Sequence, residues 1–345
     1  MKTDSTIVLT TLGLTTLTIA LLLNNLKPTT AMSTSSSLTN GLKTIKQILP
    51  APRAHWVGDG FNVFPVFANK AFTSELSPFL MFDYAAPKSF PINTGRPKGV
   101  GQHPHRGFET VTLAFQGEVE HKDSLGNVGV IGSGDVQWMT AARGIIHQEF
   151  HSNEFSKRGG VFEMCQLWVN LPAKDKMSPP KYQEILKKDI DNAVSPLYNY
   201  NSESEGCGSQ ADLAEGSVRV IAGNFGQAKG PASTFTQVDM WDITINEPNK
   251  SYEFQTIAGN NVIVFVRSGS IEVQGKPVGS QGVAIMKRDS NTKVVISSSQ
   301  EKSQVLILAG EPIEESISAQ GPFVMNTRQE IMQANVDFQS GKFGT

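Results

Sequence analysis

The amino-acid sequence predicts an all-β protein of two similar barrels that ends in a short helix. Short runs of aliphatic, β-branched and aromatic residues are separated by glycine turns, a pattern typical of a β-sandwich or barrel. Helix signals are scarce, and the two halves of the chain resemble each other faintly at matching positions. At 345 residues the chain is long enough for two domains, or for one large domain with a tail.

The expected strands are short, and a helix is expected only near the C-terminus. Examples of the strands, in chain order, are 108–115, 128–131, 136–139, 161–169, 218–221, 240–245, 262–266, 271–273, 283–286, 294–296 and 305–308. The clearest helix signal begins at Thr327, which fits a capping box with Glu330. Ile331, Ala334 and Phe338 then recur on one helical face, so a helix is expected there.

The internal similarity supports a second copy of the same barrel. Residues 113–119 can be laid over 264–271, and residues 132–139 over 279–286. On this scheme the segment around His147 falls near Leu308 and Ala309, so an alanine would replace the histidine in the second copy. Repetition of one structural unit along a chain is typical of a duplicated fold.

Composition excludes a broadly basic surface for nucleic acid, and the cysteines predict no disulfide. The net charge is -2 and the pI is near 6.3, so no direct nucleic-acid partner is expected, although whole-chain averages would hide a local basic patch. Cys165 lies in an apolar run that reads as a buried strand, and Cys207 lies in a polar run. One packed and one exposed thiol are therefore expected.

The N-terminus carries a separate signal. Residues 7–23 contain no charge, Lys2 precedes them, and small residues follow, as in a secretory signal or an uncleaved membrane anchor. The alternative is a disordered leader with a chance apolar run. A signal or anchor predicts a secreted, periplasmic, organellar or membrane-anchored protein, and a leader without function predicts a cytoplasmic one.

All six histidines lie between His55 and His151, and four of them form two pairs. His103 and His105 make the first pair, and His147 and His151 flank Glu149 in the second. Residues two apart on a strand face the same way, so each segment presents imidazoles on one side, together with apolar groups expected to face a barrel interior. Burying so many polar groups is costly unless they bind an ion, so a metal site is predicted.

The ligand types favour a borderline divalent transition metal. Three imidazoles and one carboxylate suit Fe(II), our first choice, and also Mn, Co, Ni, Cu or Zn. Glu109, Glu149 and His151 all share the expected inward register, so each is open as a ligand or as a partner of a ligand. His55 and His121 are expected to be ordinary surface or core histidines.

Several of these segments resemble one known family. Residues 103–110, 134–141 and 143–149 are similar to the signature of pirins, members of the cupin superfamily. Residues 78–83, 167–172 and 321–327 are similar too, and the likeness runs from about residue 43 to the C-terminus. The resemblance implies a bicupin, in which two β-barrels (double-stranded β-helices) are stacked and the C-terminal barrel is degenerate and metal-free.

The resemblance also implies the ligands and the division of the chain. By position the metal ligands would be His103, His105, His147 and Glu149, and Glu109 would lie behind them. Residues 1–42 would be the leader and a Ser/Thr-rich linker, 43–172 the metal-binding barrel, 173–216 a connector with a polar loop, and 217–345 the degenerate barrel. The apolar leader departs from the family pattern and argues against a nuclear role.

The activity implied by the resemblance is that of a quercetin 2,3-dioxygenase. A flavonol such as quercetin would chelate iron, Glu149 would act as the catalytic general base, and cleavage by O2 would release carbon monoxide. An alternative is a regulatory module whose metal or redox state changes its affinity for a protein partner, without turnover. A third is a metal-bearing barrel without activity.

Overall fold

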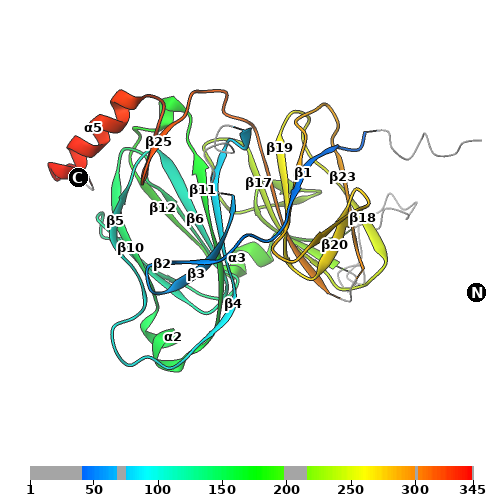
Figure 1. The fold of residues 1–345 in the computed structure, drawn as a ribbon, viewed down its shortest axis with the longest axis horizontal. Helices are drawn as coiled ribbons and strands as arrows, with labels where there is room; N and C mark the ends of the chain where they lie inside the picture. The colour runs from blue at the N-terminus through cyan, green and yellow to red at the C-terminus, as the bar shows by residue number, and fades with distance from the viewer. Residues whose placement is uncertain (1–40, 68–74, 198–215, 300–301, 344–345) are drawn as a thin grey trace, which may run out of the picture. The chain divides into compact units, whose positions relative to one another are not determined.

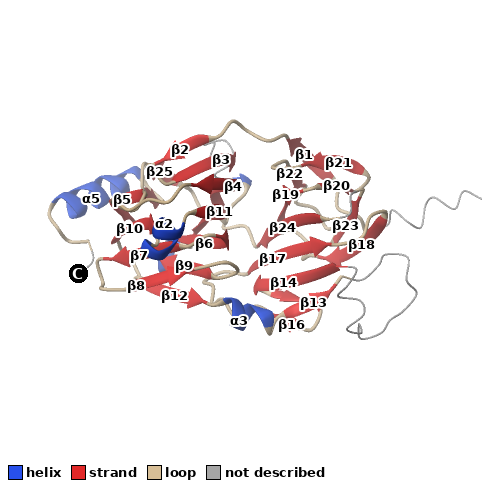
Figure 2. Cartoon of the chain, turned by 90° about the horizontal axis from the view of Figure 1, so that it is seen from below, coloured by secondary structure: helices blue, strands red, loops and turns tan. Residues whose placement is uncertain are grey.

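The computed structural model describes residues 41–67, 75–197, 216–299 and 302–343. These residues form two β-barrels, each made of a seven-stranded and a four-stranded antiparallel sheet (Figures 1 and 2). The predicted all-β bicupin fold is confirmed. The leader (7–23), Cys207 and most of the polar tract lie outside the described residues, and within them no helix is long and apolar enough to cross a bilayer.

The first barrel is built mainly from residues before 186. Its large sheet runs in the order β12-β9-β6-β11-β4-β3-β2 and its small sheet in the order β5-β10-β7-β8. The strands of the large sheet are β2 (His55–Val57), β3 (Phe61–Phe67), β4 (Phe79–Phe90), β6 (Phe108–Gln116), β9 (Val136–Thr140), β11 (Gly160–Asn170) and β12 (Lys181–Ile185). Those of the small sheet are β5 (Gly99–His105), β7 (Val119–Asp123), β8 (Val128–Ile131) and β10 (Ile145–His151).

The second barrel repeats this arrangement. Its large sheet runs β1-β22-β19-β24-β17-β14-β13 and its small sheet β18-β23-β20-β21. The large sheet contains β1 (Ile45–Leu49), β13 (Val194–Pro196), β14 (Gly216–Ala222), β17 (Val238–Ile245), β19 (Asn261–Ser268), β22 (Val283–Met286) and β24 (Ser303–Gly310). The small sheet contains β18 (Lys250–Gln255), β20 (Ser270–Val273), β21 (Lys276–Gly279) and β23 (Lys293–Ser298).

The matching strand orders correct one detail of the predicted repeat. In the small sheets β10 occupies the place that β23 occupies in the second barrel, and β11 matches β24. Ala309 lies on β24, so it cannot be the counterpart of His147, which lies on β10. The pairing of His147 with His103 matches that of Val294 with Phe254, so the counterpart of His147 is Val294.

Apolar residues from the two large sheets form a shared core between the barrels. Side chains of β4, β6, β9 and β11 pack with side chains of β14, β17, β19, β22 and β24 in this core. Phe82 and Phe265, one from each barrel, have ring centroids 4.9 Å apart. Fully burying a side chain of this size stabilises a protein by about 1.5–3 kcal/mol. Cys165 is a buried free thiol in the same core, as the sequence predicted.

Strand pairing departs from the expected division of the chain in two places. β1 precedes the first barrel in sequence but pairs with β22 of the second, and β12 lies in the expected connector but pairs with β9 of the first. Such pairings join residues far apart in the sequence, and periodicity within one segment carries no sign of them.

The C-terminal segment returns to the first barrel, where Figure 1 places α5 beside β5 and β10. It comprises β25 (Ser318–Gln320), β26 (Phe323–Met325) and α5 (Arg328–Gln339). Arg106, next to β5, pairs with Asp337 at 2.8 Å. Lys176 Nζ donates to the backbone carbonyls of Gly107 and Val324, at 2.6 and 3.0 Å. The segment is therefore anchored to the chain next to the predicted ligands.

The predicted helix is confirmed, including its cap. Thr327 and Glu330 form the reciprocal capping box at the start of α5. Ile331 and Ala334 are buried, as expected, whereas Phe338 is partly exposed. The described residues also contain α2 (Asn153–Arg158), η1 (Ala173–Asp175) and α3 (Lys187–Asp191), which the sequence did not predict. Because these helices have six residues or fewer, they are too short to show a 3.6-residue period.

Candidate metal centre

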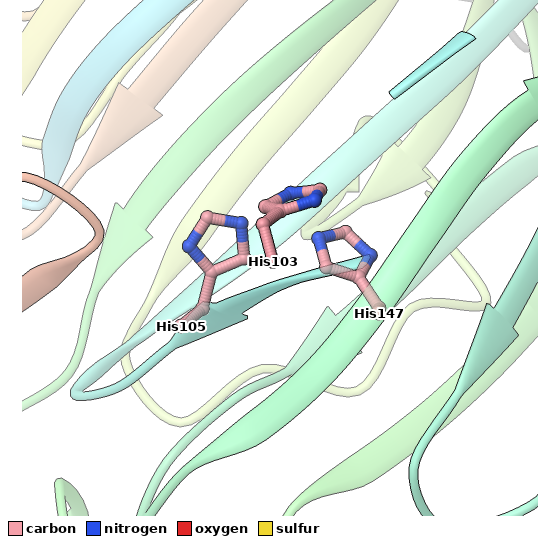
Figure 3. Close-up of side chains that lie close together, drawn as sticks. All are labelled: His103, His105 and His147. Atoms are coloured by element: carbon pink, nitrogen blue, oxygen red, sulfur yellow. The ribbon is translucent and has the colours of Figure 1, made fainter. Parts of the chain in front are cut away.

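Three histidines converge inside the first barrel, as Figure 3 shows. β5 and β10 are neighbours, and His147 lies directly opposite His103 while Ile145 lies opposite His105. Because alternate residues of a strand share a face, the three imidazoles point the same way. One nitrogen of each ring lies within 4.8 Å of the others. Among the described residues, this is the group of potential ligands that lies close enough to hold a metal ion.

The hydrogen bonds of these rings leave ligand nitrogens free. His103 Nδ1 lies 2.8 Å from the Gly101 carbonyl, so Nδ1 carries the proton and Nε2 keeps its lone pair. His105 Nδ1 and His147 Nε2 are buried and have no hydrogen-bond partner. A buried polar atom without a partner costs about 1–3 kcal/mol. A metal ion would be that partner, so the residues present fit one.

Electrostatics keep two of these rings in the form that binds metal. Burial lowers the pKa of His105 to about 3, and the neighbouring His103 lowers it further, while a hydrogen bond to the Pro322 backbone opposes this. Burial is the main cause that holds the pKa of His147 well below its usual range, and the charges of the nearby histidines lower it further. Both rings are therefore neutral at pH 7, and neutral imidazole is the metal ligand.

His121 is a buried core histidine with a partner at each ring nitrogen, as expected, and it also lies directly behind His147. Gln137 Nε2 donates to His121 Nδ1 at 2.9 Å, and His121 Nε2 lies 3.3 Å from Asp123 Oδ2. His147 Nδ1 lies 3.4 Å from His121 Nδ1, so this side of the His147 ring is occupied and its Nε2 faces the other rings. His121 and Asp123 are two residues apart on β7, so they share one face of the strand. This spacing could have indicated from the sequence that His121 faces the barrel interior.

Glu149 lies beside the three histidines but is not one of the group within 4.8 Å. It is buried, and it lines the same cavity as His103 and His105. Its carboxylate accepts hydrogen bonds from Gln166 Nε2 at 2.8 and 3.1 Å and from Thr112 Oγ1 at 3.2 Å. These contacts hold the carboxylate in one orientation next to the imidazoles, which suits either a ligand or a base.

Glu109 is directed elsewhere, which corrects the predicted register. It shares a face of β6 with Val111 and Leu113, which belong to the core between the barrels, whereas Thr112 on the opposite face contacts Glu149. The face that points into the barrel changes at Gly107, which has φ of +90°. A Cβ atom at this position would lie 1.9 Å from the Val324 carbonyl oxygen, so only glycine fits here. Thr140 donates to Glu109 at 2.7 Å, and burial raises the pKa of Glu109 to about 7.

His151 is also separate from the histidine group. Its ring packs against Phe61, Phe90 and Phe162, with centroids 4.6–5.7 Å apart, and its Nε2 lies 3.0 Å from the Gly60 carbonyl. Burial lowers the pKa of His151 to about 4. It is a core histidine, and His55 is an exposed one, as expected.

Polar side chains form a row across the large sheet beneath the site. Asp83, Gln166, Thr112 and Gln137 lie directly opposite one another on β4, β11, β6 and β9. Three of the four contact Glu149 or His121. We name these four residues the polar row.

A cavity of about 260 Å³ opens beside the histidines. Small-molecule sites usually range upward from about 300 Å³, so this cavity is close to the lower end. Most of its wall is apolar: Val57, Phe61, Val63, Met81, Val100, Met164, Trp168 and Pro322. The polar groups on it are His103, His105, Glu149, Gln166 and Asp83. An apolar wall with a few convergent polar groups is typical of a site for a small organic molecule.

The fold and the site together define a bicupin with a histidine metal site in its first barrel. Comparison with known sequences gives the family. The pirin family matches residues 60–169, and the pirin C-terminal cupin domain matches residues 240–344. The chain belongs to the pirin family, as the resemblance predicted.

Individual relatives cover nearly the whole folded part. The chain is 44% identical over 302 residues to a Pseudomonas aeruginosa protein provisionally named a quercetin 2,3-dioxygenase, covering 88% of this chain and 99% of that protein. It is 33% identical to a pirin-like protein of Solanum lycopersicum, covering 91% and 97%. A crystal structure described as quercetin 2,3-dioxygenase from Acinetobacter baumannii matches with 43% identity and a TM-score of 0.80, covering 88% and 99%.

Proposed function

We propose that this protein is a dioxygenase that cleaves flavonols such as quercetin with O2 and uses iron held by His103, His105, His147 and Glu149. The observation that carries the proposal is the group of three imidazoles, with orphaned buried nitrogens, beside an apolar cavity. The names of the Pseudomonas and Acinetobacter relatives support the choice of substrate class. The side chains present are hard-to-borderline nitrogen and oxygen donors, which suit Fe(II) among other divalent metals.

Glu149 is the proposed general base. It would accept the proton of the flavonol 3-hydroxyl, which turns the substrate into an electron-rich anion. Gln166 and Thr112 donate three hydrogen bonds to the Glu149 carboxylate and so hold it in position for that transfer. A positioned base of this kind contributes about 10²–10⁴-fold to a rate.

The cavity wall would orient the substrate and keep water out. Trp168 and Phe61 offer flat apolar surface to an aromatic ring. A bound divalent metal supplies Lewis acidity and a fixed point of attachment for two neighbouring substrate oxygens. Both oxygen atoms of O2 enter the product ester and its acid group, and the carbon that carried the 3-hydroxyl leaves as carbon monoxide.

The direct test measures turnover in the presence of O2. The protein is first loaded with Fe(II) under anaerobic conditions, and air-saturated buffer is then added. We expect O2 uptake and carbon monoxide release in equal amounts when quercetin is added, and neither with flavone, which lacks the 3-hydroxyl. Iron-loaded protein that consumes no O2 with any flavonol contradicts the proposal. Metal binding without turnover would favour the regulatory alternative, which is then tested by capture of a protein partner with and without the metal.

A further inference from the structure

Within the described part of the chain, Asp83 is the member of the polar row for which no side-chain hydrogen bond is found. Its Oδ1 atom is buried and unpartnered, and the residue lines the cavity next to the histidines. Its neighbour Gln166 gives its amide hydrogens to Glu149, so it does not serve Asp83. The other wall residues nearest to Asp83 are apolar. Met81 lies two residues before Asp83 on β4. Val63 lies two residues before Pro65, which is opposite Asp83 on β3. His55, whose charge interaction lowers the pKa of Asp83 against the larger effect of burial, makes no hydrogen bond to it.

A carboxylate in such surroundings is costly without a donor. Leaving a buried acceptor unpaired costs about 1–3 kcal/mol, and more when the group is charged. Burial accordingly raises the pKa of Asp83 to about 6. A ligand hydroxyl in the cavity that donated a hydrogen bond to the Asp83 carboxylate would reduce this cost.

The position of Asp83 separates it from the proposed base. Asp83 is directly opposite Gln166 on the neighbouring strand, and Gln166 is the residue that contacts Glu149. Adjacent strands are about 4.8 Å apart, so Asp83 lies one strand further along the cavity than the group that holds Glu149. With the chelating oxygens placed at the histidines, a hydroxyl at Asp83 would belong to another part of the substrate.

We propose that Asp83 forms a second polar subsite, which accepts a hydrogen bond from a phenolic hydroxyl on a part of the substrate remote from its chelating oxygens. This inference rests on the proposed function, because it takes the chelating end of the substrate to lie at the histidines. On this proposal Asp83 is a specificity-determining residue. It favours aromatic substrates with several hydroxyl groups over substrates whose only hydroxyl is the one that chelates the metal.

The experiment compares quercetin with 3-hydroxyflavone, which keeps the chelating oxygens and lacks all other hydroxyls. The kcat/KM of both is measured for iron-loaded wild type, Asp83→Ala, Asp83→Asn and the control Met81→Leu, which alters the same wall without a polar change. We expect Asp83→Ala to reduce the preference for quercetin on the order of tenfold to hundredfold. Turnover of 3-hydroxyflavone should change little, and Asp83→Asn should restore part of the preference because its amide oxygen still accepts.

An unchanged preference in Asp83→Ala overturns the subsite, as does an equal loss for both substrates. Wild type that turns over neither flavonol overturns the proposed function instead. In that case the subsite is tested by binding. The dissociation constants of quercetin and of 3-hydroxyflavone are measured for wild type and the three variants by quenching of the tryptophan fluorescence, and the ratio of the two constants is compared. A ratio that Asp83→Ala leaves unchanged rejects the subsite, and a reduced ratio supports it.

Discussion

The two barrels share one strand order but differ in what fills their interiors. In the first barrel the polar row crosses the large sheet as Asp83, Gln166, Thr112 and Gln137. The residues that occupy the same row in the second barrel, paired in the same register, are Trp241, Ile307, Val264 and Ala284. All four are buried and belong to one apolar core.

The histidine positions differ in the same way. Matching the paired strands places Phe254 at the position of His103, Val294 at that of His147 and Ile296 at that of Glu149. All three are buried and apolar. The second barrel therefore has the same strand arrangement with an apolar interior. It follows that the polar groups inside the first barrel are not needed to form this arrangement. Because they carry a desolvation cost, their presence points to a site.

The largest effect is expected from His147→Ala, which gives the first barrel the kind of interior that the second has. Metal content should fall well below one ion per chain, because the variant loses one of the four proposed ligands and an alanine side chain puts no donor atom in its place. Elemental analysis of protein reconstituted with Fe(II) measures this, with the exposed His55→Ala as the matched control. Full metal content in His147→Ala would show that the ion is held elsewhere.

Glu149→Gln tests whether the carboxylate of the first barrel has a role that its apolar counterpart lacks. The kcat for quercetin should fall by about 10²–10⁴-fold, because the amide cannot accept the substrate proton. The control is Ile296→Leu at the matching position of the second barrel, for which kcat should stay unchanged. A Glu149→Gln protein with wild-type kcat would rule out Glu149 as the base.

Acid should destabilise the first barrel through its buried histidines. The pKa of His151 is about 4 in the folded protein and 6.5 in the unfolded chain, so the unfolded chain binds the proton more tightly. The stability that neutral His151 contributes is full above pH 6.5 and is lost as the pH falls toward 4. Relative to His151→Phe, the metal-free wild type should lose about 3 kcal/mol of unfolding free energy between pH 7.5 and 4.

Urea unfolding at several pH values measures that difference. In His151→Phe the new ring lies among phenylalanine rings that already surround this position. Any change in unfolding free energy that is independent of pH is the same at every pH, so it cancels when the two proteins are compared across the pH range. A gap between the two proteins that does not change with pH would mean that His151 has the same pKa in the folded and unfolded states, which contradicts the prediction.

The smallest effects are expected from exchanging one residue of the row between the barrels. Thr112→Val removes one hydrogen bond to Glu149, so it should lower kcat/KM a few-fold with a stability change of about 1 kcal/mol or less. Val264→Thr places a hydroxyl among apolar side chains, and it should cost about 1–3 kcal/mol without affecting turnover. Urea unfolding and steady-state kinetics separate the two. Equal loss of stability in both variants would remove the distinction between the two interiors.

Much of the fold was predictable because the signals are local. Each predicted strand lies within an observed one or overlaps it, since a strand's alternation and its glycine turns are contained in a few residues. The start of α5 was predictable for the same reason, as Thr327 and Glu330 are three residues apart. The three histidines were predictable because each pair shares one strand face.

The direction of the remaining polar side chains was decided by tertiary structure. The turn at Gly107 places Glu109 toward the other barrel, and the phenylalanine cluster takes His151, although both share the alternation of the histidines. Asp83 joins the site because β4 pairs with β11, and no pattern within either strand indicates that pairing. The sequence by itself determined the strands, the duplication and the histidine group. Only the tertiary structure decided which carboxylates face that group, because pairing between distant strands sets the surroundings of every side chain.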